Sequence, residues 1–340
     1  MVIHPSTSRS AANLYNRAMR FTKVEALGND FLAIDGLAET TLAHLPQRPD
    51  FPELVRALCD RSCGVGADGA LVLGPPDDPD AVDFRMRIFN ADGAEAEMSG
   101  NGLRCAAMLA HARLGLLSQR VQTGAGVRAV EVRTDERGQF TGAIVDMGEP
   151  VFDLEKIGVI QDRLAAAVEG AIVPPTAVRG GRCGESSIDT GKHRPPGTAV
   201  GGTVEHTVSG VRGILVSMGN PHFVTFLDEP PKSQSAELAH LGAAIERHPA
   251  FPNRINIEFV HAPLRDRAFV LPWERGVGFT LASGTGACAA LVAGVLAGRL
   301  DREAEIGSPG GALRVRWDEA SGRVFLDGPA TIVSEGDWPL

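Results

Sequence analysis

Two stretches of small and apolar residues stand out in a chain that otherwise alternates apolar and polar positions in short runs. Ser99-Gly100-Asn101-Gly102 opens a run that stays mostly apolar through Ala110, and Ser283-Gly284-Thr285-Gly286 opens a second one through Ala293. A helix that is apolar on every side belongs in the interior of a domain. The pattern therefore predicts two buried helices, the first of which ends near Gly115, because glycine is favoured after the last turn of a helix.

The alternating runs predict strands, because a half-buried strand places successive side chains on opposite faces. These runs lie at 21–35 (two strands around a turn), 70–73, 83–90, 127–133, 142–148, 204–216, 255–260, 268–273, 313–317, 323–326 and 330–333, and a tight turn at 218–224 precedes another strand. Further helices are predicted at 51–61, 162–168 and 235–246, and the Gly- and Pro-rich residues 174–202 predict a loop or an insertion. Many short strands with one buried helix in each half favour an α+β fold, in which each half is a sheet rolled around its helix.

Composition narrows the class of protein. The 340 residues suffice for two domains, and 44% hydrophobic with 22% charged residues is ordinary for a globular protein. The net charge of −9 and the lack of a basic cluster argue against nucleic acid as a partner. The sequence has no apolar run of membrane-spanning length and no apolar secretory core near residue 1, so we expect a cytoplasmic protein with a disordered N-terminal extension.

The cysteines and lysines indicate chemistry without a metal or a cofactor. The five cysteines are Cys59, Cys63, Cys105, Cys183 and Cys288, and their spacing completes no zinc pattern, so we expect reduced and mostly buried thiols. Lysine is scarce and absent from both glycine-rich turns, which argues against a cofactor bound as a Schiff base.

The two glycine-rich turns are suited to bind an anion. The first N–H groups of a helix lack partners within the helix, and the helix dipole adds positive charge there, which favours a carboxylate or a phosphate. A single turn of this kind is more often an ordinary helix start with serine as its cap. Because the pattern occurs twice before the same type of helix, we expect both helices to point at one shared site.

Other polar clusters fall at expected loops. They are Asn29, Asn90-Ala91-Asp92-Gly93, Asn220-Pro221-His222, Asn256 and Glu274-Arg275. Each cluster taken alone is explained equally well by an ordinary structural role, as a turn, a hydrogen-bonded core group or a surface ion pair. Together they offer amide groups and one guanidinium, which suit a small ligand with more than one carboxylate.

The ordered motifs FTKVEALGNDF, RIFNADGAEAEMSGNGLRC, MGNPHFV, RINIEF and WERGVGFTLASGTGACA cover the chain from Phe21 to about Gly336. In this order they resemble the diaminopimelate epimerase family, which inverts an amino-acid α-carbon without a cofactor. The resemblance implies two pseudo-symmetric domains, each a rolled, mostly antiparallel sheet around a central helix. It places an N-terminal extension at 1–20, an N-terminal epimerase-like domain at 21–137 with 328–340, and a C-terminal one at 138–327. It also implies a possible homodimer.

The same resemblance assigns roles to residues. The groups that would hold the distal end of the substrate are Asn29, Asn90, Asn220, Asn256 and Arg275. The backbone N–H groups that would hold the reacting carboxylate belong to Gly100, Asn101, Gly284 and Thr285. The catalytic positions are Ser99 and Ser283, one on each face of the α-carbon, with His222 and Glu274 beside them. The implied reaction converts LL- to meso-2,6-diaminopimelate without pyridoxal phosphate, by proton transfer between two bases, in lysine and peptidoglycan biosynthesis.

The chain departs from the family at the two positions that matter most for this chemistry. The family has a cysteine at each, whereas this chain has Ser99 and Ser283. A helix N-terminus can lower a thiol pKa to roughly 3.5–7.5, whereas a serine hydroxyl is far less acidic, so we expect severely impaired epimerase activity. Two origins fit the sequence: an engineered double Cys→Ser variant of a family member, and a natural relative with changed chemistry. The alternatives are a relative acting on another amino acid as a racemase or dehydratase, and a catalytically silent amino-acid-binding protein.

Overall fold

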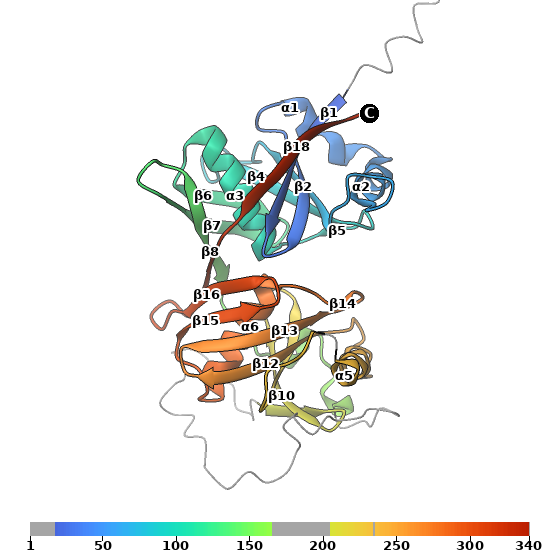
Figure 1. The fold of residues 1–340 in the computed structure, drawn as a ribbon, viewed down its shortest axis with the longest axis vertical. Helices are drawn as coiled ribbons and strands as arrows, with labels where there is room; N and C mark the ends of the chain where they lie inside the picture. Colours follow the sequence, from blue (N-terminus) through green and yellow to red (C-terminus); the bar gives the residue numbers. More distant parts are fainter. Residues whose placement is uncertain (1–17, 165–204, 234, 340) are drawn as a thin grey trace, which may run out of the picture.

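Two halves of similar architecture make up the protein, and a computed structural model describes residues 18–164, 205–233 and 235–339 of it. In Figure 1 the first half, in blue and green, lies above the second half, in yellow and orange. The strands of the first half are β1 (Ala18–Ala26), β2 (Asn29–Asp35), β3 (Gly69–Gly74), β4 (Phe84–Asn90), β5 (Glu95–Ala96), β6 (Ser118–Thr123), β7 (Gly126–Thr134) and β8 (Phe140–Gly148). Its helices are α1 (Thr40–Ala43), the 3₁₀ turn η1 (Leu45–Gln47), α2 (Phe51–Cys59) and α3 (Gly100–Leu114).

The second half repeats this series. Its strands are β9 (Glu205–Val208), β10 (Val211–Ser217), β11 (Pro221–Phe226), β12 (Asn256–Leu264), β13 (Arg267–Glu274), β14 (Gly278–Phe279), β15 (Glu303–Ser308), β16 (Gly311–Trp317) and β17 (Val324–Gly328). Its helices are α4 (Leu154–Ile157), the 3₁₀ turn η2 (Gln161–Arg163), α5 (Ala236–Glu246) and α6 (Gly284–Leu296). The last strand, β18 (Thr331–Pro339), returns to the first half and pairs with β1.

The strand pairings show the pseudo-symmetry directly. In the first half the order is β18–β1–β2–β3–β4–β6–β7–β8, and every step is antiparallel except β2–β3 and β4–β6. In the second half the order is β9–β10–β11–β12–β13–β15–β16–β17, and the parallel steps β11–β12 and β13–β15 fall at the same places. Antiparallel pairing of β8 with β17 joins the two series. Each half thus has the same mixed, mostly antiparallel sheet.

The central helices fill the two sheets. In α3 every residue from Gly100 to Ala110 is buried, and in α6 burial extends with one exception from Gly284 to Val295. One continuous apolar core contains both helices and the sheet faces around them. Two further cores lie outside this one: α2 packs on the first sheet, and α5 packs on the second. The predicted α+β fold with a buried helix in each half is therefore confirmed, and α3 ends at Gly115 as expected.

Some elements differ from the sequence prediction. The run 204–216 is a hairpin rather than one strand, because Ser209 and Gly210 both adopt positive φ (51° and 78°) and turn the chain. The strand β15 was not predicted, since Glu303–Ser308 offers little beyond Ala304 and Ile306 as apolar signal. Of the helix predicted at 162–168, the part up to Arg163 belongs to a 3₁₀ turn capped by Leu164, and residues 165–168, like 174–202 and most of the extension 1–20, lie outside the described residues.

The predicted domain bounds fall near the junction of the two halves. The strand β8, which begins just after residue 138, pairs with β7 of the first half and with β17 of the second. The connection from β17 to β18 crosses at 328–331. We propose a first domain of residues 21–137 together with 328–340 and a second domain of residues 138–327. The strand β8 joins the two domains, because it pairs with a strand of each. Among the described residues, none of the helices is long and apolar enough to cross a membrane.

Candidate active site

The two glycine-rich turns begin the central helices in the same way. Ser99 and Ser283 both have extended backbone (φ −142° and −133°), and each is the N-cap of its helix. The hydroxyl oxygen of Ser99 accepts the N–H of Gly102 at 3.1 Å, and that of Ser283 accepts the N–H of Gly286 at 3.1 Å. Each serine thus satisfies one first-turn N–H, while other N–H groups of the turn remain available for a ligand.

The N-termini of α3 and α6 meet where the two halves touch. A Cβ placed on Gly284 would lie 3.4 Å from the Cα of Gly100 and 3.5 Å from Oδ1 of Asn101. The two helix starts therefore lie close together. Two helix dipoles consequently place their positive ends at one point.

A cleft of about 1170 Å³ opens at this point between the halves. Among the residues that line it are Asn29, Asn90, Ser99, Gly100, Asn101, Asn220, Asn256, Glu274, Arg275, Ser283, Gly284 and Thr285. The cleft thus brings together residues from both halves that are up to 281 positions apart (Gly28 to Pro309). Of the residues expected at the site, His222 does not line this cleft, because it is fully buried behind it.

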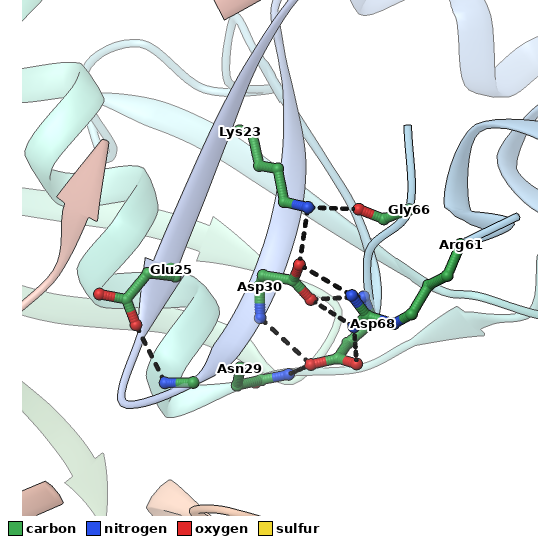
Figure 2. A network of polar contacts seen from close by, with 8 residues as sticks. Lys23, Glu25, Asn29, Asp30, Arg61, Gly66 and Asp68 are labelled. Atoms are coloured by element: carbon green, nitrogen blue, oxygen red, sulfur yellow. Dashed lines mark hydrogen bonds and ion pairs between the residues drawn. The ribbon is translucent and has the colours of Figure 1, made fainter. Parts of the chain in front are cut away.

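A network of charged groups on the first half holds Asn29 at the cleft wall (Figure 2). The ammonium of Lys23 lies 3.0 Å from Asp30, and the guanidinium of Arg61 lies 2.7 Å from both Asp30 and Asp68. Asp68 in turn accepts a hydrogen bond from Nδ2 of Asn29 at 2.9 Å. Burial alone would raise the pKa of Asp30, but hydrogen bonds from Arg61 and Lys23 lower it overall, so the carboxylate stays ionised.

Glu274 is a carboxylic acid in the cleft whose acidity is strongly altered. Burial, and to a lesser degree the nearby Glu258 carboxyl, raise the pKa of Glu274 from 4.5 to about 7. The hydroxyl of Thr280 donates to its Oε1 at 3.1 Å, which opposes the rise without cancelling it. A carboxyl with a pKa near 7 can both accept and donate a proton at neutral pH.

His222 is held between two polar side chains in the interior. Its Nδ1 lies 2.8 Å from Oε1 of Glu258, and its Nε2 lies 2.9 Å from Oδ1 of Asn220. Both His222 and Glu258 have no exposed side-chain surface, whereas Asn220 lines the cleft. In this conformation His222 orients Asn220 and does not itself reach the cleft.

Arg275 lies at the wall of the cleft. Its backbone N–H donates to Oδ1 of the buried Asn256 at 3.0 Å, and its Nη1 donates to the Asn253 carbonyl at 3.3 Å. The guanidinium is otherwise exposed at the cleft wall. It can therefore still donate to a carboxylate of a ligand.

None of the described thiols replaces a reactive cysteine at the helix starts: even Cys59, which lines the cleft, has its pKa raised to about 11 by burial. Cys59, Cys63, Cys105 and Cys288 are all free thiols, and Cys183 lies outside the described part of the chain. Cys105 and Cys288 follow the two serines but are completely buried, and burial raises the pKa of Cys105 to about 12. Both thiols belong to the core, as expected for buried cysteines.

Several groups around the cleft were not anticipated from the sequence. Arg61 and Asp68 line the cleft, and Glu258 supports His222 from behind. Arg104, on α3, is buried beneath the cleft and donates to Asn101. Glu258 and Arg104 lie within motifs already noted, two residues from Asn256 and three residues from Asn101, but their burial depends on tertiary packing that the motifs do not encode.

Comparison with known proteins identifies the family. The family model described as diaminopimelate epimerase matches residues 21–152 and 214–333. The chain belongs to the diaminopimelate epimerase family. Diaminopimelate epimerase of Heliobacterium modesticaldum is 37% identical over 328 residues, covering 95% of this chain and all of that protein. The Nostoc punctiforme enzyme is 40% identical over 324 residues, covering 94% of this chain and 99% of that protein. The family is one of isomerases, as the resemblance implied.

Solved structures support the same fold at greater distance. A hydroxyproline epimerase from Agrobacterium vitis superposes with a TM-score of 0.62 at 14% identity, covering 97% of this chain and 93% of that one. A probable proline racemase from Agrobacterium radiobacter superposes with a TM-score of 0.59 at 16% identity, covering 95% and 93%. At this identity the likeness concerns the fold alone.

Proposed function

We propose that the cleft binds a dicarboxylic amino acid of the diaminopimelate type, with the reacting carboxylate between the first turns of α3 and α6. The observation that carries this proposal is the close approach of the two helix N-termini at Gly100 and Gly284, both of which line the cleft. N–H groups from two helices would then surround one carboxylate, and both dipoles would stabilise negative charge on it. Such stabilisation is what the removal of a weakly acidic α-proton needs.

The distal amino and carboxylate groups would lie against the other wall. The exposed guanidinium of Arg275 suits the distal carboxylate, because Arg binds carboxylates in a planar, bidentate way. The amides of Asn29, Asn90, Asn220 and Asn256 would bind the remaining distal groups. This arrangement is supported by the cleft, which is lined by all of these residues together.

The catalytic step of the family, inversion of LL- to meso-diaminopimelate by two bases, would be severely impaired in this chain. Ser99 and Ser283 would occupy the positions on the two faces of the α-carbon, and each hydroxyl oxygen already accepts an N–H. A hydroxyl stabilised in this way is a weak base at neutral pH, whereas a thiol at a helix N-terminus ionises readily. We therefore propose a protein that keeps the substrate pocket of a lysine- and peptidoglycan-pathway epimerase and has little turnover.

A second candidate is proton transfer on one face of another amino acid, as a racemase or a dehydratase would begin. The pKa of Glu274, raised to about 7 by burial and by Glu258, favours this alternative, because such a carboxyl can act as a base where the serines cannot. A silent binding protein is the outcome if neither reaction occurs.

The deciding experiment is to make the double variant Ser99→Cys/Ser283→Cys and to follow LL-diaminopimelate in deuterated water by NMR. We expect deuterium incorporation at the α-carbon together with formation of the meso isomer, and neither at a comparable rate in the parent chain. Calorimetric titration of the parent with meso-diaminopimelate should show binding, and Arg275→Met should weaken it. Rapid exchange by the parent would contradict the impairment, and failure of the double variant to bind or invert would contradict the substrate assignment.

Two further properties stay predictions. A cytoplasmic location follows from the nature of the proposed pathway. Assembly as a homodimer is expected from the family, and light scattering on the purified protein would measure its mass against the 35.8 kDa of one chain.

A further inference from the structure

Arg104 carries a charge in the interior beneath the cleft. Its side chain has no exposed surface, although arginine is rarely buried without a partner. Its guanidinium donates from Nε to the Pro329 carbonyl at 3.0 Å, from Nη1 to the Gly100 carbonyl at 3.3 Å and from Nη2 to Oδ1 of Asn101 at 2.8 Å. Within residues 18–164, 205–233 and 235–339, no carboxylate forms an ion pair with it.

The guanidinium remains charged at neutral pH. Burial lowers the pKa of Arg104 to about 10, which is still well above 7. The ionisable groups that act on it at longer range are Glu25 on β1, Asp327 on β17, and the thiols of Cys105 and Cys288 on the two central helices. A positive charge buried without a carboxylate is costly for stability, so stability alone does not explain its presence.

The contacts of Arg104 concentrate on the first turn of α3, where the helix meets the N-terminus of α6. Two of its three acceptors belong to Gly100 and Asn101, which line the cleft. The third acceptor, Pro329, lies in the connection between the two halves. The guanidinium thus ties this helix start to the junction of the halves.

Hydrogen bonding fixes the orientation of the amides that continue from Arg104 to the cleft. A guanidinium can only donate, so Oδ1 of Asn101 faces Arg104, and its Nδ2 donates to Oδ1 of Asn29 at 3.2 Å. Nδ2 of Asn29 then donates to Asp68, whose carboxylate can only accept. Both the oxygen and the nitrogen of the Asn101 side-chain amide are therefore engaged. The group of Asn101 that we expect to bind a ligand is its backbone N–H.

We infer that Arg104 is a positioning residue for α-proton transfer, which holds the first turn of α3 in its anion-binding geometry and adds a buried positive charge beneath the bound carboxylate. The inference rests on the proposed function. When the α-proton leaves for a base, its electron pair spreads into the carboxylate, whose charge grows from −1 towards −2. In an interior of low dielectric a nearby fixed cation stabilises that growth strongly. Arg104 itself transfers no proton.

The test uses the Ser99→Cys/Ser283→Cys protein as the background. Arg104→Met removes the charge at similar length, and Gln119→Met is the matched control. Gln119 is also buried and donates to carbonyls of Ala107 and Leu116 near the other end of α3, so its loss reports only a structural defect. We expect Arg104→Met to lower kcat for inversion by about 100-fold, as for loss of an oxyanion-hole donor, with a smaller change in KM. Gln119→Met should leave kcat near the background value.

A second measurement does not depend on the substrate. The pH dependence of iodoacetamide alkylation gives the pKa of the thiol introduced by Ser99→Cys, and we expect Arg104→Met to raise that pKa by about one unit. Gln119→Met should not change it. If the background protein fails to invert diaminopimelate, the proposed function is wrong, and this thiol pKa still decides the role of Arg104. An unchanged thiol pKa in folded Arg104→Met protein overturns the inference.

Arg104→Lys provides a test if the methionine variant does not fold. A buried lysine loses its proton at lower pH than a buried arginine, so this variant should show a new alkaline loss of kcat and a thiol pKa close to that of the background at neutral pH. A residue that served only to pack the helix would show no new alkaline limb, and that result would refute the electrostatic role.

Discussion

The raised pKa of Glu274 leads to a quantitative prediction about stability. Between pH 4.5 and pH 7 the folded protein holds a proton on Glu274 that the unfolded chain has released. The unfolding free energy therefore falls as the pH rises through this window and levels off above it. The contribution is fully present below pH 4.5, the ordinary value of a glutamate in the unfolded chain.

The shift from 4.5 to about 7 gives the magnitude. Each pKa unit corresponds to about 1.36 kcal/mol, so the loss amounts to about 3 kcal/mol between pH 4.5 and pH 8. Glu274→Gln removes the titration and keeps an oxygen that can accept from Thr280, which donates at 3.1 Å in the parent. The variant should exceed the stability of the parent by about 1 kcal/mol or less at pH 5 and by about 3 kcal/mol at pH 8.

Urea unfolding at half-unit steps from pH 5 to pH 9 measures this difference. Glu136→Gln, at an exposed turn position, is the control for losing one negative charge and should track the parent. The informative quantity is the difference between the two curves, because other titrating groups cancel in it. Curves for Glu274→Gln and the parent that run parallel across pH 5–8 would refute the burial of Glu274 as the cause of its raised pKa.

Three further changes test other contacts by urea or thermal unfolding. Ser99→Ala removes the cap of α3 and should cost about 1 kcal/mol, whereas Ser99→Thr should retain most of it; equal stability of the two variants would contradict the cap. Gly310→Ala places a Cβ 2.0 Å from a carbonyl oxygen of the β1–β2 turn and should cost about 1–3 kcal/mol, while Gly307→Ala, whose Cβ has 3.5 Å of room, is the control; equal effects would argue against the clash. His222→Leu leaves the buried carboxylate of Glu258 without its partner and should cost about 3–5 kcal/mol, most of which the added change Glu258→Leu should recover; a single-variant cost below about 1 kcal/mol would show that the pair is not buried as described.

Much of the fold could be predicted because its signals are local. The apolar runs after Ser99 and Ser283 are too evenly apolar for a surface helix, and both prove to be central helices. The extent of β18 could not be predicted beyond 330–333, because its residues after Ile332 are mostly exposed and polar. Its position is set instead by pairing with β1, a contact between the two ends of the chain that no local pattern encodes.

In the candidate site, too, some residues could be predicted from local sequence and others could not. Residues at turns, such as Asn90 and Asn220, could be predicted as cleft residues because turns expose their side chains. Arg104 could not be, since within α3 it looks like a polar residue on a helix surface, and its burial arises from the approach of the second half. The burial of His222 could not be predicted either, because it depends on Glu258 of the neighbouring strand β12.

The return of β18 to the first half determines the order in which the two halves can be completed during synthesis. The second half closes its sheet edge with β9, which immediately precedes β10, whereas the first half must wait for residues 331–339 to pair with β1. The half that leaves the ribosome first is thus the last to be finished, and until then β1 exposes an unpaired edge that other chains could join. Moving residues 331–339 in front of β1 by circular permutation would give the first half the local hairpin that the second half already has, and would let each half close as it emerges.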